Sequence, residues 1–275
     1  MDFIIINGEI LKKPETGYLP FLWDESFVIT QKFWFGFGGI PLFQENLKNI
    51  VLTLNTLNAD IPDLLKNEHE MFRITKRILN KNKFYRSGII SCQVFIGRTE
   101  TNTIISSLAF PEFDFPISKQ GLIINFSEFE KYRGNPLNQF AFSNAANWNF
   151  AIARNRDTTF HNSIFVNERG IVCDCISANI FLIKGKTLYT PQTDTGCFTD
   201  SIRSHIINIA PKANLKVIES DSLKKEDIFK MNEIFLASEE NGIQWVLGVG
   251  NKRFVHRYSI KIHEYLNDYL KNLVQ

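Results

Sequence analysis

The segment Gly170-Ile171-Val172-Cys173-Asp174-Cys175-Ile176-Ser177-Ala178-Asn179-Ile180-Phe181 is the best starting point for predicting the fold. It holds parts of two short apolar runs, which predict strands at 170–174 and 179–183. Further short strands are predicted on both sides of it, at 121–126, 163–166, 187–190, 215–218, 233–237 and 242–246. In this second half of the chain, helical spacing is limited to about 145–156, 201–209, 222–229 and 258–273. Many short strands with few helices are typical of a closed or highly curved mixed sheet, and not of a Rossmann sheet.

The first part of the chain predicts a separate α+β unit. Residues 3–6 and 9–11 form a hairpin pattern around Asn7-Gly8, a pair typical of a type I′ turn. Strands are then expected within 27–43, helices at 44–59 and 62–82, and strands at 88–97 and 103–110. The segment 111–116 has a proline at each end and is interpreted as a linker. We therefore expect a smaller domain over 1–115 and a larger domain with a barrel-like sheet over 116–275.

Composition limits the possible partners. The 275 residues include 31 basic and 29 acidic side chains, for a net charge of +2. This balance gives no reason to expect nucleic acid or a membrane as a partner. The first residues lack the features of a signal peptide, so the four cysteines are predicted to be free thiols of a cytoplasmic protein. Cys173 and Cys175 form a lone C-x-C without a C-x-x-C knuckle, and no metal site is expected.

Four segments, taken together, resemble the class IV aminotransferases, a group that includes branched-chain and D-amino acid aminotransferases and 4-amino-4-deoxychorismate lyase. The segment 170–181 is similar to the family pattern G-x-[VI]-x-E-x-x-x-x-N-[IL]-F. Residues 185–191 are similar to G-x-L-x-T-P with one extra residue, and 198–203 to L-P-G-I-T-R at a helix start. Residues 233–243 are similar to E-[VI]-F-x-x-[NGS]-[ST]-x-x-G-[IV]. Fainter matches lie at 3–9 and 21–32.

The resemblance implies a fold, a cofactor and a set of contacts. The fold would be the two-domain α+β architecture of fold-type IV pyridoxal-phosphate enzymes. The protein would be an aminotransferase or lyase that acts on a small amino-group-bearing substrate, and a homodimer. Pyridoxal phosphate would be bound through residues that match the family motifs, namely Lys32, Asp174, Ser201, Ile202, Arg203 and Ser238.

The sequence departs from the family where the cofactor would be held covalently. Aligning Asn147-Trp148 with the family's Asn-Tyr places Ser143, or with one residue of slack Asn144, where the family has its Schiff-base lysine. Serine cannot form an imine. Between Lys119 and Lys184 the chain has only Lys131, on the far side of a Gly134-Asn135-Pro136 turn, and we do not expect it to substitute.

Other departures fall on the cofactor's remaining contacts. Asp174 stands for a glutamate that faces the pyridine nitrogen, and Lys32 stands for an arginine, which loses the bidentate fork. Asp200 replaces the glycine of the phosphate loop and puts a carboxylate where a phosphate would lie, unless it is an ordinary N-cap. Glu239 falls on the usual hydroxyl position and adds a second repulsive charge.

These observations leave three hypotheses for the function. The first is an aminotransferase or aminodeoxychorismate-lyase-like enzyme. The second is a lysine-less homologue that binds a small ligand, with the cofactor held non-covalently or absent, and acts as a binding or regulatory protein. The third is a structural or partner-binding dimer.

Overall fold

The computed structural model describes residues 3–13, 27–98 and 100–274. The earliest part of the faint motif match, at 21–26, lies outside these residues. The chain divides into two compact units, of which unit 1 comprises Met1–Phe115 together with Leu270–Gln275, and unit 2 comprises Pro116–Tyr269. The final residues of the chain thus group with unit 1.

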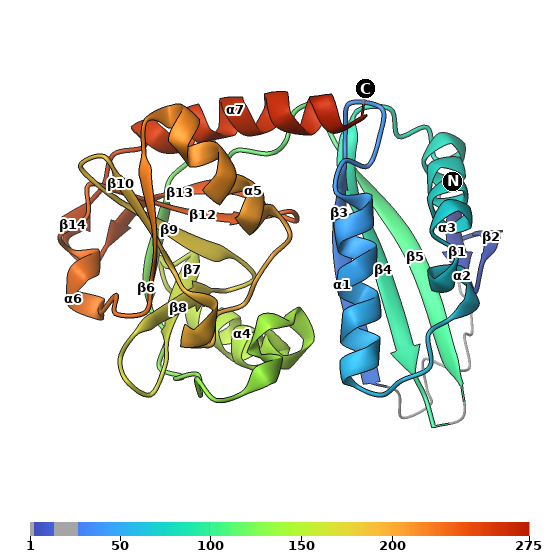
Figure 1. The fold of residues 1–275 in the computed structure, drawn as a ribbon, viewed down its shortest axis with the longest axis horizontal. Coiled ribbons are helices and arrows are strands. Elements are labelled where there is room, and N and C mark those ends of the chain that lie inside the picture. The colour runs from blue at the N-terminus through green and yellow to red at the C-terminus, as the bar shows by residue number, and fades with distance from the viewer. Residues whose placement is uncertain (1–2, 14–26, 99, 275) are drawn as a thin grey trace. The chain divides into compact units, whose positions relative to one another are not determined.

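Unit 1 is a five-stranded antiparallel sheet with the strand order β2-β1-β5-β4-β3. Its strands are β1 (Phe3–Ile6), β2 (Glu9–Lys12), β3 (Phe27–Phe35), β4 (Ser87–Ile96) and β5 (Thr101–Phe110). Helix α1 (Phe43–Thr56) packs on β3, α3 (Glu68–Lys81) packs on β1, and the four-residue α2 (Asp63–Lys66) precedes α3 (Figure 1). Asn7 and Gly8 both have positive φ, as the predicted type I′ turn requires.

Unit 2 is built on a curled sheet of nine strands. Its main path has the order β11-β10-β9-β12-β13-β6-β7-β8, and β14 (Lys252–Arg253) pairs with β13. The strands are β6 (Leu122–Phe126), β7 (Asn162–Val166), β8 (Val172–Cys175), β9 (Asn179–Lys184), β10 (Thr187–Pro191), β11 (Lys216–Ser220), β12 (Glu233–Ser238) and β13 (Gly242–Val249). The terminal strand β8 also contacts β9 and β10, so the sheet curls back on itself, as the many short strands predicted.

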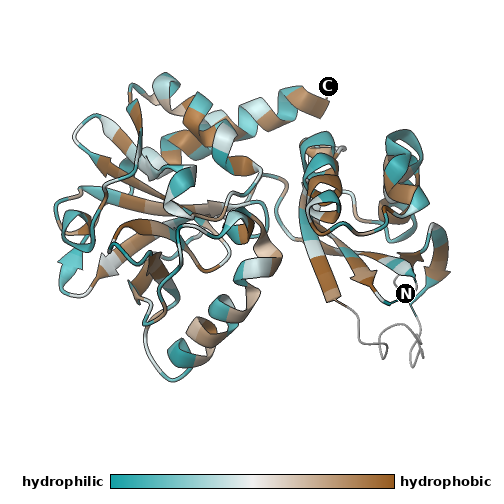
Figure 2. Cartoon of the chain, turned by 60° about the horizontal axis from the view of Figure 1, so that its bottom comes forward, coloured by the Kyte–Doolittle hydropathy of each residue, from teal (hydrophilic) through white to brown (hydrophobic). Residues whose placement is uncertain are grey.

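The helices of unit 2 complete its packing. They are α4 (Ala141–Asn155), α5 (Ile202–Ile209), α6 (Lys225–Ile228) and α7 (Arg257–Val274), which runs on into unit 1. None of the helices in the described part of the chain is long and apolar enough to span a membrane. Figure 2 shows apolar ribbon concentrated in the strands and hydrophilic ribbon mainly on loops and parts of the helices.

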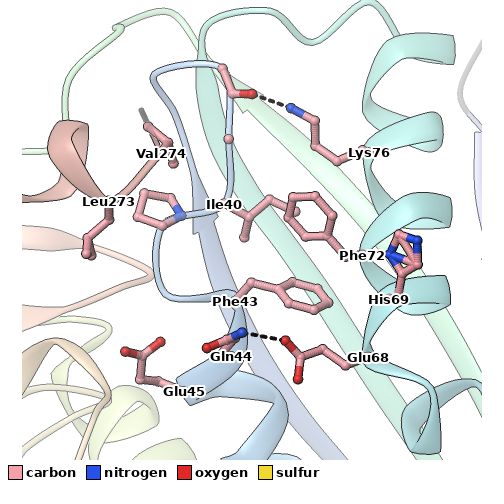
Figure 3. Close-up of a pocket in the computed structure, with 13 residues that line it drawn as sticks. Ile40, Phe43, Gln44, Glu45, Glu68, His69, Phe72, Lys76, Leu273 and Val274 are labelled. Carbon is pink, nitrogen blue, oxygen red and sulfur yellow. Dashed lines mark hydrogen bonds between the residues drawn. The ribbon is translucent and has the colours of Figure 1, made fainter.

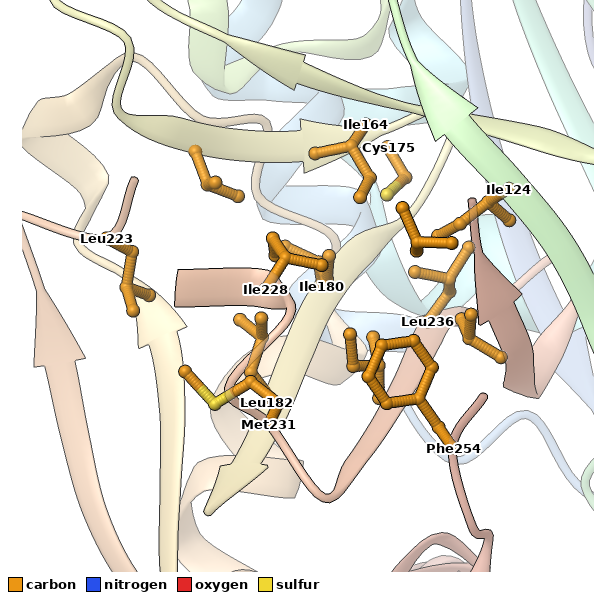
Figure 4. Packing of buried hydrophobic residues seen from close by; sticks show 14 of the residues in the cluster. Ile124, Ile164, Cys175, Ile180, Leu182, Leu223, Ile228, Met231, Leu236 and Phe254 are labelled. Atoms are coloured by element: carbon orange, nitrogen blue, oxygen red, sulfur yellow. The ribbon is translucent and has the colours of Figure 1, made fainter. Parts of the chain in front are cut away.

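Two apolar clusters lie on different faces of the curled sheet. The larger cluster contains Ile124, Ile164, Ile180, Leu182 and Leu236 and is closed by Phe254 and residues around α6 (Figure 4). The smaller cluster joins Trp148 and Ala151 of α4 to Phe165, Ile176 and Phe198. The Trp148 and Phe198 rings meet edge to face, with centroids 5.1 Å apart.

The face of the sheet that carries the smaller apolar cluster also carries Asp174, a predicted cofactor contact. Asp174 on β8 is directly opposite Phe165 on β7, and directly opposite residues share a face of the sheet. Because Phe165 packs with α4, the carboxyl group of Asp174 also points to the α4 side and away from the larger apolar cluster.

Candidate functional site

Asp174, which is predicted to face the pyridine ring of the cofactor, is bound by two other segments of unit 2. Its Oδ2 accepts a hydrogen bond from the backbone N–H of Phe198 at 2.5 Å and forms a close ion pair with the Lys131 ammonium group. The side chains of Asp174 and Lys131 are 0% and 2% exposed. Burial raises the pKa of Asp174, and the Lys131 ammonium and the Phe198 N–H oppose this rise.

Lys131 reaches Asp174 because its backbone is tied to the strands beside β8. Its N–H donates to the Val166 carbonyl at 2.8 Å, and its own carbonyl accepts from the Glu168 N–H at 3.1 Å. Lys131 also forms an isolated parallel bridge with Asn167. The segment around Lys131 therefore lies at the end of β7, which brings together two residues that are 43 positions apart in the sequence.

Ser143 and Asn144 lie in the first turn of α4, where both side chains bind main-chain carbonyls. Ser143 Oγ donates to the Leu137 carbonyl at 2.6 Å. The Asn144 amide donates to the carbonyls of Asn138 and Phe140 at 2.8 and 2.7 Å. These acceptors lie in or next to the 3-10 helix η2 (Pro136–Gln139). Both side chains hold η2 against α4, and neither carries an amine.

Asp200 binds two segments of the chain with one oxygen. Its Oδ1 accepts from the Ile202 N–H at 3.0 Å and from the Glu239 N–H at 3.1 Å. Burial raises the pKa of Asp200 to about 6, the two N–H groups oppose this rise, and the nearby Glu240 adds to it. Ser238 is buried, and its Oγ accepts from the Asn241 N–H at 3.2 Å.

A chain of hydrogen bonds joins Asp174 to Asp200. The backbone of Phe198 donates to Asp174, and its carbonyl accepts from the Asn179 side-chain amide at 2.5 Å. The Asn179 Oδ1 then accepts from the Asp200 N–H at 2.9 Å. The residues 198–200 are thus fixed between the ends of β8 and β9.

Arg203 and Lys32 have different surroundings. The Arg203 guanidinium donates to the Pro191 carbonyl at 2.7 Å and to Glu219 Oε2 at 2.8 Å, which ties α5 to β10 and β11. Lys32 lies half-buried on β3 of unit 1. Of the predicted contact residues, Asp174 and Ile202 are joined by the hydrogen-bond network of Asp200, and Ser201 and Ser238 are sequence neighbours of its members.

Two residues of this network, Lys131 and Asn179, are absent from the set predicted from the sequence. Lys131 was not expected to take part, because it lies well before the expected lysine position in the sequence. Asn179 could have been identified from the sequence, because it is the asparagine of the N-[IL]-F pattern. In the structure it connects the Phe198 carbonyl to the Asp200 N–H. For Lys131 the pairing is purely tertiary, and no local pattern indicates it.

A cavity of about 800 Å³ lies in unit 1 and uses none of these residues. Ile40, Phe43 and Phe72 supply apolar surface, and Glu45, Glu68, His69 and Lys76 are among the polar residues around it (Figure 3). Gln44 donates to Glu68 at 2.6 Å, and the Lys76 ammonium donates to the Gly38 carbonyl. The last turn of α7 contributes Leu273 and Val274.

The comparisons with known proteins agree with the predicted fold. Residues 35–246 match the family model described as amino-transferase class IV. A probable branched-chain-amino-acid aminotransferase of Rickettsia bellii is 25% identical over 232 residues, which are 79% of this chain and 77% of that protein.

Solved structures extend this likeness to most of the chain. A branched-chain amino acid aminotransferase of Thermobaculum terrenum in its PLP form has a TM-score of 0.84 at 14% identity, covering 99% of this chain and 94% of that one. A putative 4-amino-4-deoxychorismate lyase of Legionella pneumophila has a TM-score of 0.75 at 19% identity, covering 93% and 96%. The predicted fold-type IV architecture is confirmed, and the chain belongs to the class IV aminotransferase family.

Proposed function

We propose that this chain is a member of the family without Schiff-base catalysis, and that it acts as a small-ligand-binding or regulatory protein. The family is dependent on pyridoxal phosphate. The proposal follows from comparing the three groups that the cofactor requires with the residues present here. These groups are an amine for the aldehyde, a carboxylate for the pyridine nitrogen, and an anion-binding site for the phosphate.

The requirement for an amine is not met by Ser143 or Asn144. A hydroxyl and a carboxamide cannot form an imine, and both side chains already hold the carbonyls of η2. Either assignment of the lysine position leads to the same conclusion.

The requirement for a carboxylate is met only in part. Asp174 is present, but its Oδ2 is taken by Lys131 and Phe198. Within the described residues no partner is found for Asp174 Oδ1, and this atom is the one feature that suits a ligand N–H group. It is buried, however, and a ligand would have to displace Lys131 or neighbouring residues to reach it.

The phosphate end fits worst. The backbone N–H groups of Ile202 and Glu239 donate to Asp200, so a phosphate there would lose these donors and meet a carboxylate. Taken together, the residues present do not fit pyridoxal phosphate as a covalently held group. The observation that carries the proposal is the ion pair of Lys131 and Asp174 in a chain that has no amine at 143 or 144.

A second candidate is an enzyme that uses Lys131 as a relocated amine. It is favoured by the position of Lys131, which is a buried lysine in contact with the predicted cofactor contact Asp174. Two arguments stand against it. The Lys131 nitrogen is already engaged as a donor to a buried carboxylate. Its partner Asp174 is the residue expected at the pyridine nitrogen rather than at the aldehyde.

Peptide mapping after borohydride reduction separates the two candidates. The protein is mixed with pyridoxal phosphate, reduced and digested, and pyridoxylated lysines are located by mass spectrometry. We expect only low, scattered labelling of exposed lysines, equal in the wild type and in Lys131→Arg. Stoichiometric labelling of Lys131, lost in Lys131→Arg, would contradict the proposal and favour the relocated amine.

The binding role is tested on the same protein. Because the relatives include branched-chain amino acid aminotransferases, a branched-chain amino acid and its 2-oxo acid are the first probes. We expect at least one to raise the melting temperature, without amino-group transfer in the presence of pyridoxal phosphate. Amino-group transfer above the rate without protein would overturn the proposal.

The protein is further proposed to be a homodimer, which light scattering at micromolar concentration tests directly.

A further inference from the structure

The carboxylate of Asp200 occupies a position formed by two backbone N–H groups from distant parts of unit 2. Ile202 is the first residue of α5, and Glu239 directly follows β12. Their N–H groups converge on the same oxygen, Asp200 Oδ1, at 3.0 and 3.1 Å.

Local capping accounts for only half of this arrangement. An aspartate commonly accepts from the N–H two residues later, as Asp200 does from Ile202, and this stabilises a helix start. Glu239 lies 39 residues away from Asp200 and directly follows β12, so its N–H has no part in capping α5. Two convergent N–H groups, one of them at the positive end of a helix, form a site suited to an oxyanion.

The position of the Asp200 carboxylate is fixed from a third side. Its own backbone N–H donates to Asn179 Oδ1 at 2.9 Å, and Asn179 is held in turn by the Phe198 carbonyl. The loop that carries Asp200 is therefore anchored to β9, and the side chain is presented to the two N–H groups by a rigid backbone.

We infer that Asp200 is a built-in anion, which occupies an oxyanion site formed by the N–H groups of Ile202 and Glu239 and thereby excludes phosphate-bearing ligands from unit 2. The ligand class that the site would take without this side chain is a phosphate monoester or inorganic phosphate. The inference concerns only the anion site and does not depend on the absence of a Schiff base at 143.

Asp200→Ala and Asp200→Gly test the inference, because both remove the carboxylate. Asp221→Ala is the matched control, since it removes the charge of an exposed aspartate elsewhere in unit 2. Each ¹⁵N-labelled protein is titrated with inorganic phosphate, and the amide signals of Ile202 and Glu239 are followed by NMR. Folding of each variant is checked by its amide spectrum before titration.

We expect phosphate to shift both amide signals saturably in the Asp200 variants, with an affinity at least tenfold above that of the wild type and of Asp221→Ala. Because the buried Glu239 carboxylate lies next to the site, Asp200→Ala is also combined with Glu239→Gln. Wild-type protein that binds phosphate at these amides as tightly as the variants would overturn the inference. Failure of every folded Asp200 variant, including the combined one, to bind phosphate there would also overturn it.

Discussion

Removing the ammonium group of Lys131 should destabilise the protein in a manner that depends on pH. In Lys131→Met the Asp174 carboxylate would remain buried without its counter-ion. Loss of one partner of a buried ion pair costs about 3–5 kcal/mol. The Asp174 carboxyl group can avoid remaining charged by taking up a proton. With an unfolded pKa of about 3.9, protonation costs about 5 kcal/mol at pH 7.5 and about 1.5 kcal/mol at pH 5, so it limits the loss of stability mainly at low pH.

The sign of the pH dependence follows from proton binding. In Lys131→Met the pKa of Asp174 in the folded state lies above its unfolded value, so the native state holds a proton that the unfolded state releases. The free energy of unfolding therefore falls as the pH rises, by at most about 1.4 kcal/mol per unit between pH 5 and 7.5.

Asp174→Asn should show the opposite trend. It leaves Lys131 buried without a counter-ion, and burial lowers the pKa of a lysine below its unfolded value. The native state then holds fewer protons than the unfolded state, so the free energy of unfolding rises with pH. The double variant Lys131→Met/Asp174→Asn removes both charges and keeps an acceptor for the Phe198 N–H, and we expect it to lie within about 2 kcal/mol of the wild type.

Urea unfolding of the four proteins at pH 5, 6, 7 and 8 measures these differences. Arg133→Met is the control, because Arg133 pairs with Asp194 at 3.0 Å on the surface and its loss should cost under about 1 kcal/mol at every pH. Single-variant costs that add up within about 0.5 kcal/mol in the double variant would refute the reasoning. Parallel pH profiles for the two single variants would refute it as well.

Three further predictions concern other residues of unit 2. Burial raises the pKa of Asp200 to about 6, above its unfolded value, so its ionisation destabilises the fold as the pH rises from about 4 to about 6. Asp200→Asn should therefore gain about 1–2 kcal/mol of stability relative to the wild type over this pH range. A stability difference between the two proteins that stays constant with pH in urea unfolding would contradict this prediction. Glu233 accepts hydrogen bonds from the N–H groups of Arg257, Tyr258 and Ser259, at 2.6–2.9 Å. Glu233→Ala should therefore lower the free energy of unfolding by about 2–4 kcal/mol in the same assay. A loss below about 1 kcal/mol would exclude a role of Glu233 in capping α7. Ser143→Lys alone should not give a visible Schiff-base absorbance band with pyridoxal phosphate, and a band that survives gel filtration would show that the remaining contacts suffice.

Much of the fold could be predicted from periodicity, because most elements bury one face on a sheet. The curled mixed sheet of unit 2 and the antiparallel unit 1 match the expected strands within a few residues. The predicted helix at 62–82 is in fact two helices, because Asn67 ends α2 and its side chain caps α3 by accepting from the Glu70 N–H at 3.0 Å. Helix α4 begins at Ala141, earlier than the predicted 145, since Ser143 and Asn144 bind carbonyls within its first turn.

The candidate site could be predicted only where it follows local motifs. Asp174 and Asp200 were identified from the segments 170–181 and 198–203. The conflict between Asp200 and a phosphate stays a prediction, and the structure adds that Asp200 accepts from two N–H groups. The role of Lys131 could not be predicted, because it depends on how β7 and β8 bring residues 131 and 174 together. Sequence patterns carry such long-range pairings weakly, and a single lysine in a loop is usually exposed.

The residues at Ser143, Lys131 and Asp200 support one another physically, and this would make the proposed loss of the family chemistry hard to reverse in one step. The buried Asp174 carboxylate needs a counter-ion, and Lys131 supplies it. The two convergent N–H groups of Ile202 and Glu239 need an acceptor, and Asp200 supplies that. Phe198 and Asn179 connect Asp174 and Asp200 through hydrogen bonds. Removing the Lys131 ammonium or the Asp200 carboxylate therefore leaves a polar group of this one network unpaired. A lysine restored at 143 therefore meets a site whose other two contacts are already satisfied by the chain itself.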